Sequence, residues 1–209
     1  MVGRLVDLTM PIHEGMPFNP DHFPPQITPY AQVATHGWSA SRLVLDSHLG
    51  THLDAPCHFV DGAPGLDDIP LGHLVGPTQV IHLDSVRDDE AIGPERLPII
   101  KNPRELMSTG WWRDADDPDR YFTRYPYLTL DAPAVLINSG VRLVGIDGSS
   151  VDRDGETHKE FLSRGVVIVE NLISLDKLPE TCTVWILPLP IAGGDGSPVR
   201  AVAEVALPG

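Results

Sequence analysis

The chain has 209 residues, of which 15 are lysine or arginine and 29 are aspartate or glutamate, so its formal net charge is −14 with histidine neutral. We expect one domain spanning residues 1–209, because domains usually contain about 100–200 residues. Nucleic acids and anionic membrane surfaces attract positive charge, so the acidic balance argues against both as partners. A small uncharged or cationic ligand fits the charge better.

The sequence lacks the features of an exported or membrane protein. Residues 1–15 contain no apolar run of the about 7–15 residues that a secretory signal needs. The longest apolar stretches are far shorter than the ~20 residues that cross a bilayer. Only two cysteines occur, Cys57 and Cys182, too few for a disulfide framework. We therefore expect a cytoplasmic protein.

The N-terminal segment is rich in proline and aromatic residues between residues 10 and 35. Such a segment cannot form a regular helix or a central strand. We expect residues 1–35 to form an ordered arm that wraps the surface. The sequence leaves open whether this arm covers a pocket or only packs.

The rest of the chain alternates short apolar segments with turns, as its 21 prolines and 19 glycines indicate. The pattern predicts strands at 42–45 and 78–83, helices at 103–107 and 131–139, a strand at 143–146, a helix from His158, and strands at 166–169, 184–187 and 199–205. The helix at 103–107 rests on a capping residue, Asn102, followed by proline. Residues 114–119 are expected to form a solvated acidic loop. This interleaving predicts an α/β fold with a mixed sheet.

Three of the nine histidines lie within eleven residues, and an aspartate lies among them: His48, His52, Asp54 and His58. Imidazole and carboxylate groups are the ligands that zinc, manganese and iron accept. In a straight strand His48 and His52 would lie about 13 Å apart, too far to share one ion. A bend is therefore required, and Gly50 can supply it because it adopts backbone angles closed to other residues.

Two more candidate ligands lie downstream. Glu170 follows a buried apolar run, where an unpaired charge would be costly and a metal would satisfy it. His158 begins the helical segment before that strand, so a helix-to-strand return could bring the two side chains together.

At this point the sequence resembles the cyclase family, which includes bacterial kynurenine formamidases and isatin hydrolases. The resemblance rests on His158 with Glu170 twelve residues later, and on three motifs: HLGTHLDAPCHF (48–59), VGIDGSSVD (144–152) and LPLPIAGGDGSPVRA (187–201). Together these span nearly the whole chain. The resemblance implies a swivelling β/β/α fold, with a barrel-like mixed sheet and flanking helices, and a homodimer or homotetramer.

The resemblance also implies two divalent metal ions, zinc or manganese, and a role for each residue. His48, His52 and Asp54 would hold one ion, Asp54 would bridge to a second, His158 would bind the second, and Glu170 would contact both. His58 would be the catalytic acid/base. The residue types alone do not separate His58 from the ligands.

The substrate implied is an amide on an aromatic scaffold. Typical kynurenine formamidases carry a tryptophan in the arm that stacks on the substrate, and Phe18 offers a replacement aromatic face here. Three readings stay open: hydrolysis of an aromatic formamide, a different reaction such as opening of a cyclic amide or lactone or a cyclisation, and a non-catalytic metal-binding protein. The last would close the coordination sphere.

Other residues receive weaker expectations. Asp147, Ser150 and Asp152 could orient ligands or simply form a turn. The glycine-rich run 193–196 could approach the site closely. No functional role is expected for the remaining histidines, His13, His22, His36, His73 and His82.

Overall fold

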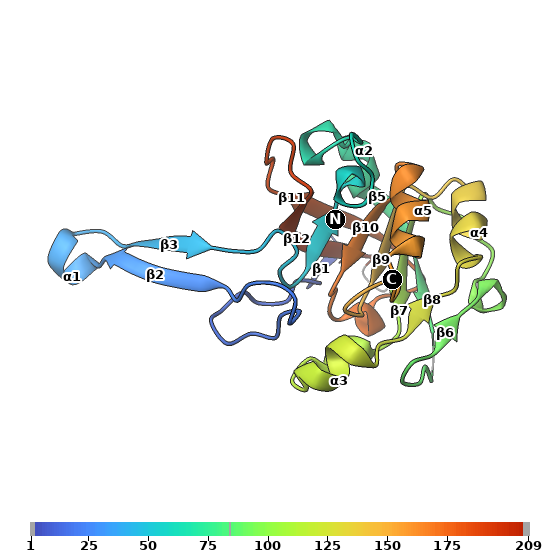
Figure 1. Ribbon diagram of the computed structural model, residues 1–209, viewed down its shortest axis with the longest axis horizontal. Helices are drawn as coiled ribbons and strands as arrows, with labels where there is room; N and C mark the ends of the chain where they lie inside the picture. The colour runs from blue at the N-terminus through green and yellow to red at the C-terminus, as the bar shows by residue number, and fades with distance from the viewer. Residues whose placement is uncertain (1–2, 84, 207–209) are drawn as a thin grey trace.

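Seven strands close into a barrel within residues 3–83 and 85–206, the part of the chain that the computed structural model describes (Figure 1). They are β4 (His52–Asp54), β5 (Val75–His82), β7 (Arg104–Ser108), β9 (Leu143–Ile146), β10 (Val167–Glu170), β11 (Thr181–Pro188) and β12 (Gly196–Val205). The ring runs β12-β11-β5-β7-β9-β10-β4 and closes because β4 pairs with both β10 and β12. β5, β7, β9 and β10 run parallel and the other pairings are antiparallel. The predicted mixed sheet and barrel-like core are confirmed.

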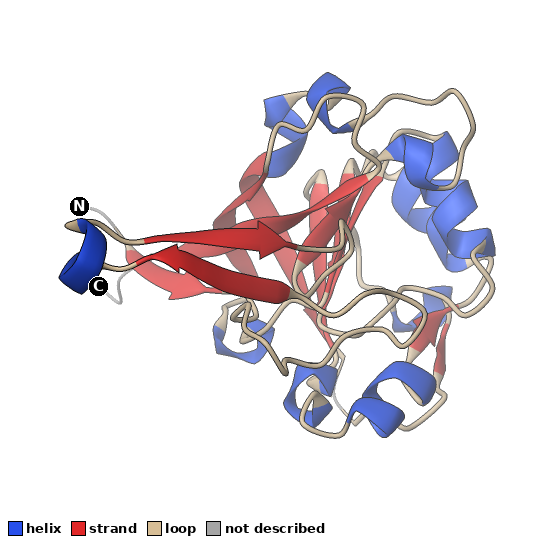
Figure 2. Ribbon diagram, turned by 60° about the vertical axis from the view of Figure 1, so that its left-hand side comes forward, coloured by secondary structure: helices blue, strands red, loops and turns tan. Residues whose placement is uncertain are grey.

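Side chains alternate between the two faces of each strand and divide the core into two layers. The inner layer fills the barrel and includes Leu53, Leu106 and Val169. The outer layer packs strand residues such as Ile168 under two helices, α4 (Ala132–Asn138) and α5 (Glu156–Ser163). Figure 2 shows these helices gathered on one side of the sheet. Because the central strands are covered on both faces, their sequences are continuously apolar.

The predicted helix at 103–107 is wrong, because Arg104–Ser108 forms β7 in the middle of the parallel strands. Every residue of this strand is buried. Burial between β5 and β9 outweighs the capping signal of Asn102 and Pro103, which contributes only about 1 kcal/mol. The helices expected at 131–139 and from His158 are confirmed as α4 and α5.

Shorter elements complete the body of the molecule. They are β1 (Arg4–Asp7), β6 (Ala91–Ile92), β8 (Tyr127–Leu128), α2 (Leu71–Leu74), α3 (Pro118–Thr123), and 3₁₀ turns at Pro56–His58, Leu66–Asp68, Pro94–Arg96, Trp111–Asp114 and Leu175–Lys177. β1 pairs with β12, so the first residues of the predicted arm belong to the sheet. In the expected acidic loop, the Asp117 side chain accepts a hydrogen bond from the Arg120 N–H and caps α3. None of the helices in the described ranges is long and apolar enough to cross a membrane.

From Gln26 onward the arm continues into a hairpin that ends at Val44 and projects from the barrel (Figures 1 and 2). Its strands are β2 (Gln26–Ala31) and β3 (Ala40–Val44), and α1 (Val33–His36) forms its tip. Proline is tolerated because the hairpin has free edges, and the register shifts between Pro29 and Ala31. The strand expected at 42–45 therefore belongs to the hairpin and not to the barrel.

A buried carboxyl group in β7 leads to a pH-dependent stability. Glu105 is fully buried, and burial raises its pKa from 4.5 to about 8, against a smaller opposing effect of the Asn102 backbone. Between these two pH values the unfolded chain releases the proton and the folded chain keeps it, so the free energy of unfolding falls as pH rises. Glutamine does not titrate, so we expect the free energy of unfolding of Glu105→Gln to lack this fall. The difference in unfolding free energy between the variant and the wild type should therefore grow in favour of the variant by about 1.4 kcal/mol per pH unit between the two pKa values. Urea unfolding at a series of pH values measures this difference, and parallel profiles for the two proteins would contradict it.

Candidate metal and active site

The histidine motif turns sharply at Gly50, as the spacing of its ligands requires. Gly50 has φ +57°, a left-handed conformation that glycine adopts without strain. The turn folds His48 back over the start of β4, and the ring centroids of His48 and His52 lie 5.1 Å apart. The bend expected from the sequence is therefore confirmed.

The neighbours of β4 complete the cluster. The register places Glu170 of β10 beside His52, and Gly196 of β12 beside Asp54. His52 and Asp54 therefore share the face of β4 opposite to the barrel interior. A Cβ atom at Gly196 would lie 2.6 Å from Cε1 of His48, so the absence of a side chain there makes room for the His48 ring.

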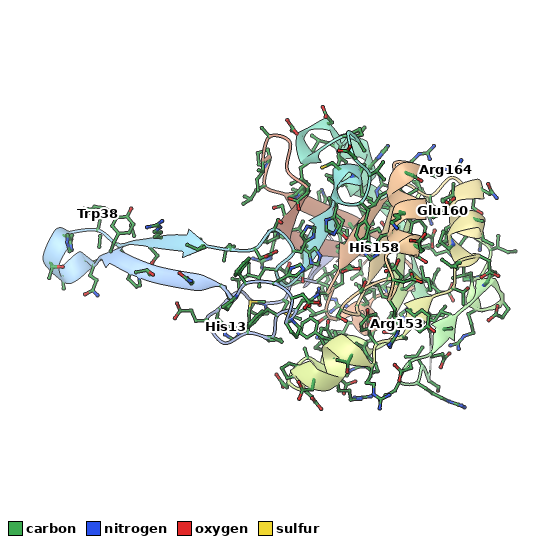
Figure 3. All side chains as sticks on the ribbon, viewed as in Figure 1. His13, Trp38, Arg153, His158, Glu160 and Arg164 are labelled. Carbon is green, nitrogen blue, oxygen red and sulfur yellow. The ribbon has the colours of Figure 1, made fainter. Side chains whose placement is uncertain are left out.

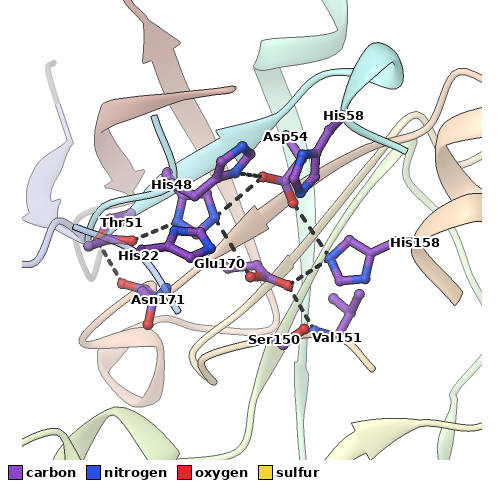
Figure 4. A network of polar contacts seen from close by, with 12 residues as sticks. His22, His48, Thr51, Asp54, His58, Ser150, Val151, His158, Glu170 and Asn171 are labelled. Atoms are coloured by element: carbon purple, nitrogen blue, oxygen red, sulfur yellow. Dashed lines mark hydrogen bonds and ion pairs between the residues drawn. The ribbon is translucent and has the colours of Figure 1, made fainter. Parts of the chain in front are cut away.

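Asp54 is the centre of the cluster (Figure 4). Its Oδ1 lies 2.8 Å from Nδ1 of His48 and 3.3 Å from Nε2 of His52. Its Oδ2 is buried and has no hydrogen-bond partner among the described residues, and Nε2 of His158 is 3.7 Å away. A buried carboxylate oxygen without a partner costs free energy, which a bound cation would offset.

His158 and Glu170 form the other half of the cluster. His158 lies in the first turn of α5, where Asp152 accepts hydrogen bonds from its backbone N–H at 2.9 Å and from its Nδ1 at 2.8 Å. This arrangement directs Nε2 toward Glu170 Oε1, 3.2 Å away. The same Glu170 oxygen accepts the Val151 N–H. Asp152 therefore orients His158, one of the two roles that the sequence left open.

His58 lies on the exposed side of the cluster. It ends the 3₁₀ turn Pro56–His58, and its ring stacks on that of His48 with centroids 3.9 Å apart. Its Nδ1 lies 3.9 Å from Asp195 Oδ2, and 26% of its side chain is exposed. Burial lowers the pKa of His58 to about 4, so the ring is neutral near pH 7 and can accept a proton.

The carboxylates and the buried histidines of the cluster shift each other's pKa values toward the charged forms. Burial alone would lower the pKa of His48, but its contacts with Asp54 and Asp195 raise that pKa to about 9. Burial would raise the pKa of Asp54, yet the neighbouring histidines hold it well below its ordinary value. These shifts have a common physical cause, because an ionised carboxylate in a low-dielectric site requires a proton or a metal ion beside it.

Two overlapping sets of donor atoms fit divalent ions. His52, Asp54 and Glu170 form one set, and His48, Asp54 and His58 form the other; within each set the ligand atoms all lie within 4.8 Å of one another. Nitrogen and carboxylate oxygen donors suit zinc and manganese. Asp54 belongs to both sets.

The cluster faces a cavity of about 510 Å³. The arm contributes Phe18, which is half-buried and also packs against Met10, Met16 and Leu49. Phe59 and Phe122 provide further aromatic walls. The arm therefore covers part of a pocket, the question that the sequence left open.

Comparison with known proteins places the chain in a family. The "Putative cyclase" family model matches residues 6–153. The chain belongs to the cyclase family. The chain thus has the fold of this family and is a cyclase-family hydrolase.

Cyclase-family relatives match over nearly the whole chain. The kynurenine formamidase of Paracidovorax citrulli (strain AAC00-1) is 36% identical over 222 residues, covering 95% of each protein. That of Geobacillus thermodenitrificans (strain NG80-2) is 31% identical, covering 96% of this chain and 97% of the relative.

Solved structures of the cyclase family share the fold. A potential metal-dependent hydrolase with cyclase activity superposes with a TM-score of 0.82 and 31% identity, covering 98% of this chain and 99% of the other. Isatin hydrolase A from Labrenzia aggregata, bound to benzyl benzoate, superposes with a TM-score of 0.88 at 26% sequence identity. The match covers 98% of this chain and 94% of the other.

The structure brings together all the expected site residues: His48, His52, Asp54, His58, His158 and Glu170 in the cluster and Phe18 in the cavity wall. The glycine-rich run 193–196 approaches the site as expected, but no role was expected for the side chain of Asp195 or for His22. Oδ2 of Asp195 lies within hydrogen-bond distance of His48 Nε2, at 3.0 Å, and His22 lines the cavity. An acidic residue inside a glycine-rich run was the one signal that could have indicated Asp195. By contrast, Asp147 binds the 109–110 loop and takes no part in the cluster.

The hydrogen bond from His158 to Asp152 leads to a prediction about metal affinity. We expect Asp152→Asn to weaken divalent-ion binding by about 10–100-fold, because the carboxylate no longer fixes the imidazole ring and its basicity. Competition with a chelating dye measures the affinity. Asp116→Asn, at an exposed position, serves as the control. Equal affinities of the Asp152 variant and the wild type would contradict the orienting role.

Proposed function

We propose that this protein is a metal-dependent hydrolase that cleaves the C–N bond of a formamide on an aromatic amine, with N-formylkynurenine as the model substrate. The observation that carries the proposal is the buried Oδ2 of Asp54, which has no hydrogen-bond partner among the described residues, inside a cluster of imidazoles and carboxylates that opens on an aromatic-walled cavity. Full-length relatives named kynurenine formamidase support the same reaction.

Two divalent ions, zinc or manganese, fit the donor atoms present. We assign His48, His52 and Asp54 to one ion, His158 to the other, and Glu170 to both, with Asp54 as the bridge. When bound, such ions lower the pKa of water and polarise a carbonyl group. Asp54 belongs to both sets of donor atoms, which supports its assignment as the bridge, whereas His58 belongs to the second set as well, so the metal content of a His58 variant decides whether His58 is a ligand.

His58 handles the proton in this proposal. Its neutral ring lies on the cavity side of His48, so it can take the proton from the attacking water. It then returns that proton to the nitrogen that leaves with the aromatic ring, which makes the amine a better leaving group. Asp195, near Nδ1, is placed to stabilise the protonated ring between the two transfers.

The aromatic walls position the substrate. Phe18 from the arm and Phe59 beside His58 face the cavity. We assign Phe18 as the surface on which the substrate ring packs, because aromatic rings favour offset or edge contacts. The aromatic amine is therefore held next to His58.

Opening of a cyclic amide is the second candidate. The match to isatin hydrolase A supports it, because that structure shares the fold over nearly the whole chain. The same residues would then attack a ring carbonyl. A lactonase or a cyclase reaction would use the same cluster. In a non-catalytic metal-binding protein, neither His58 nor the cavity would have a function.

Side-by-side assays decide between these candidates. The protein, loaded separately with zinc and with manganese, is given N-formylkynurenine, isatin and an aromatic lactone, and each product is followed optically. We expect the highest kcat/KM for N-formylkynurenine. Preference for isatin or the lactone would overturn the formamidase assignment and leave the metal site standing.

We also propose that the hairpin β2–β3 docks on a second copy of the chain, giving the homodimer or homotetramer that the family resemblance implies. Ala31 alone is buried among the residues of its two strands, and Tyr30, Trp38 and Leu43 are more than half exposed. An isolated two-stranded hairpin is marginally stable, so a partner surface would stabilise it. Figure 3 shows Trp38 near the far end of the hairpin, away from the barrel.

Light scattering tests the hairpin assignment. We expect a species of at least twice the 22.8 kDa chain mass, and a shift toward the monomer in Trp38→Glu. Ile99→Glu, at an exposed apolar position on the body, is the control and should not change the mass. A 22.8 kDa wild-type species would contradict the proposal.

Cys57 and Cys182 are both free thiols. Because free thiols persist in reducing compartments, we propose that the protein works in the cytoplasm. Cell fractionation tests this, and recovery in an exported fraction would contradict it.

A further inference from the structure

The ring of Phe59 contacts two histidines that the proposed function assigns to different tasks. It stacks on the ring of His158, with centroids 4.7 Å apart and 24° between the planes. It lies nearly perpendicular to the ring of His58, at 86°, with centroids 4.6 Å apart. The face of His58 stacks on His48, so His58 is held between His48 and Phe59. One side chain therefore touches both the assigned acid/base and an assigned metal ligand.

The fold fixes the position of Phe59. This residue follows the 3₁₀ turn Pro56–His58, and its backbone N–H donates to the Pro56 carbonyl. Proline at the start of the turn sets the backbone angle there in advance. The Phe59 side chain is half-buried and packs against the outer layer of the core. The ring is therefore held by the turn and the core before any ligand binds.

Gly155 provides the space that the Phe59 ring fills. It is buried just before α5, in a left-handed conformation with φ +79°. A Cβ atom at Gly155 would lie 2.6 Å from Cε1 of Phe59, too close for any side chain. The Gly155 N–H donates to Asp152 Oδ1 at 3.1 Å, and the same oxygen lies 2.8 Å from His158 Nδ1. The segment that orients His158 therefore also makes room for Phe59.

The contact with Phe59 adds a restraint that the hydrogen bond to Asp152 does not supply. A hydrogen bond at Nδ1 fixes one edge of the His158 imidazole and leaves the ring able to tilt about that edge. Phe59 covers one face of the imidazole, and closely packed side chains leave no space into which the ring could tilt. Together the two contacts hold His158 Nε2 at 3.2 Å from Glu170 Oε1.

We propose that Phe59 is a positioning residue that keeps the imidazoles of His158 and His58 at one distance and in one orientation to each other, in the space left by Gly155. The inference rests on the proposed metal-dependent hydrolysis, in which His158 binds a metal ion and His58 transfers the proton. Phe59 acts through these two histidines and not on the reacting bond. Its loss should therefore lower metal affinity and kcat and leave KM close to that of the wild type.

Phe59→Leu tests the proposal, because leucine keeps an apolar side chain and removes the flat ring. We expect zinc affinity, measured by competition with a chelating dye, to fall about 2- to 10-fold, the size of an aromatic contact. The visible absorption bands of the cobalt-loaded protein, which report ligand geometry, should shift. For N-formylkynurenine, kcat should fall by about 10-fold or more, because small displacements of positioned groups cost up to ~10²-fold.

Two further variants separate positioning from general packing. Phe122→Leu makes the same change in another aromatic residue of the cavity wall, whose ring contacts Tyr121, and should retain the zinc affinity and the cobalt spectrum. Gly155→Ala pushes on the Phe59 ring and should also weaken zinc binding. Because leucine lacks the Cε1 atom, Gly155→Ala should weaken zinc binding less in the Phe59→Leu background. The backbone strain of alanine is common to both backgrounds and cancels in this comparison.

Unchanged zinc affinity and an unchanged cobalt spectrum in Phe59→Leu would overturn the positioning role. A rise in KM alone would also overturn it, because Phe59 would then be only a wall for the substrate. Equal effects of Gly155→Ala in the two backgrounds would contradict the role of the space at Gly155. If the wild type does not cleave N-formylkynurenine, the formamidase assignment fails, and the zinc affinities and cobalt spectra still decide the role of Phe59.

Discussion

Replacing Asp54 with asparagine is expected to abolish both metal binding and turnover. Oδ1 of Asp54 contacts His48 and His52, and Oδ2 is buried and has no hydrogen-bond partner in the part of the chain that the structure describes. The asparagine side chain has nearly the same volume but no charge, so the cluster loses the carboxylate shared by both sets of donor atoms. Removing one partner of a buried charged group typically costs about 3–5 kcal/mol. A loss of that size in ion binding corresponds to a factor of about 10² to 10⁴ in affinity.

Elemental analysis after dialysis and the rate of N-formylkynurenine hydrolysis measure the effect of Asp54→Asn. Asp61→Asn changes an exposed aspartate close in sequence and should retain its metal and its activity. A fully metallated Asp54→Asn protein would rule out the bridging role of this carboxylate.

Replacing His58 with alanine is expected to lower kcat by about 10²-fold or more while the metal content stays that of the wild type. A positioned acid/base contributes about 10²–10⁴-fold. The metal measurement is decisive here, because His58 also lies within ligand distance of His48 and Asp54. If His58→Ala loses one ion, His58 is a ligand and the proton transfer belongs to another group. Full activity of the variant would exclude both roles.

Much of the site could be predicted because local sequence determines it. His48, Gly50 and His52 lie on one turn, and the spacing alone required the bend that Gly50 makes at φ +57°. Glu170 ends an apolar strand, so its carboxylate had to lie at the edge of the core. The barrel strands β9 and β10 were predicted for a similar reason, because their branched apolar residues are buried on both faces.

The parts that could not be predicted depend on contacts between distant segments. Asp195 reaches His48 only because β12 pairs with β4, which brings Gly196 beside Asp54. His22 joins the cavity through Asp46, a contact that no local pattern encodes. β7 was assigned to a helix because its capping signal is local, whereas its strand pairing with β5 and β9 is not.

The most direct test is the turnover of N-formylkynurenine by the same preparation in three states: as metal-loaded protein, after chelation, and after reconstitution with zinc or manganese, with bound metal quantified at each step. We expect hydrolysis in the first state, loss of the ions and of activity in the second, and recovery of both in the third. Undiminished hydrolysis by chelated, metal-free protein would contradict a metal-dependent hydrolase built on Asp54 and its neighbours.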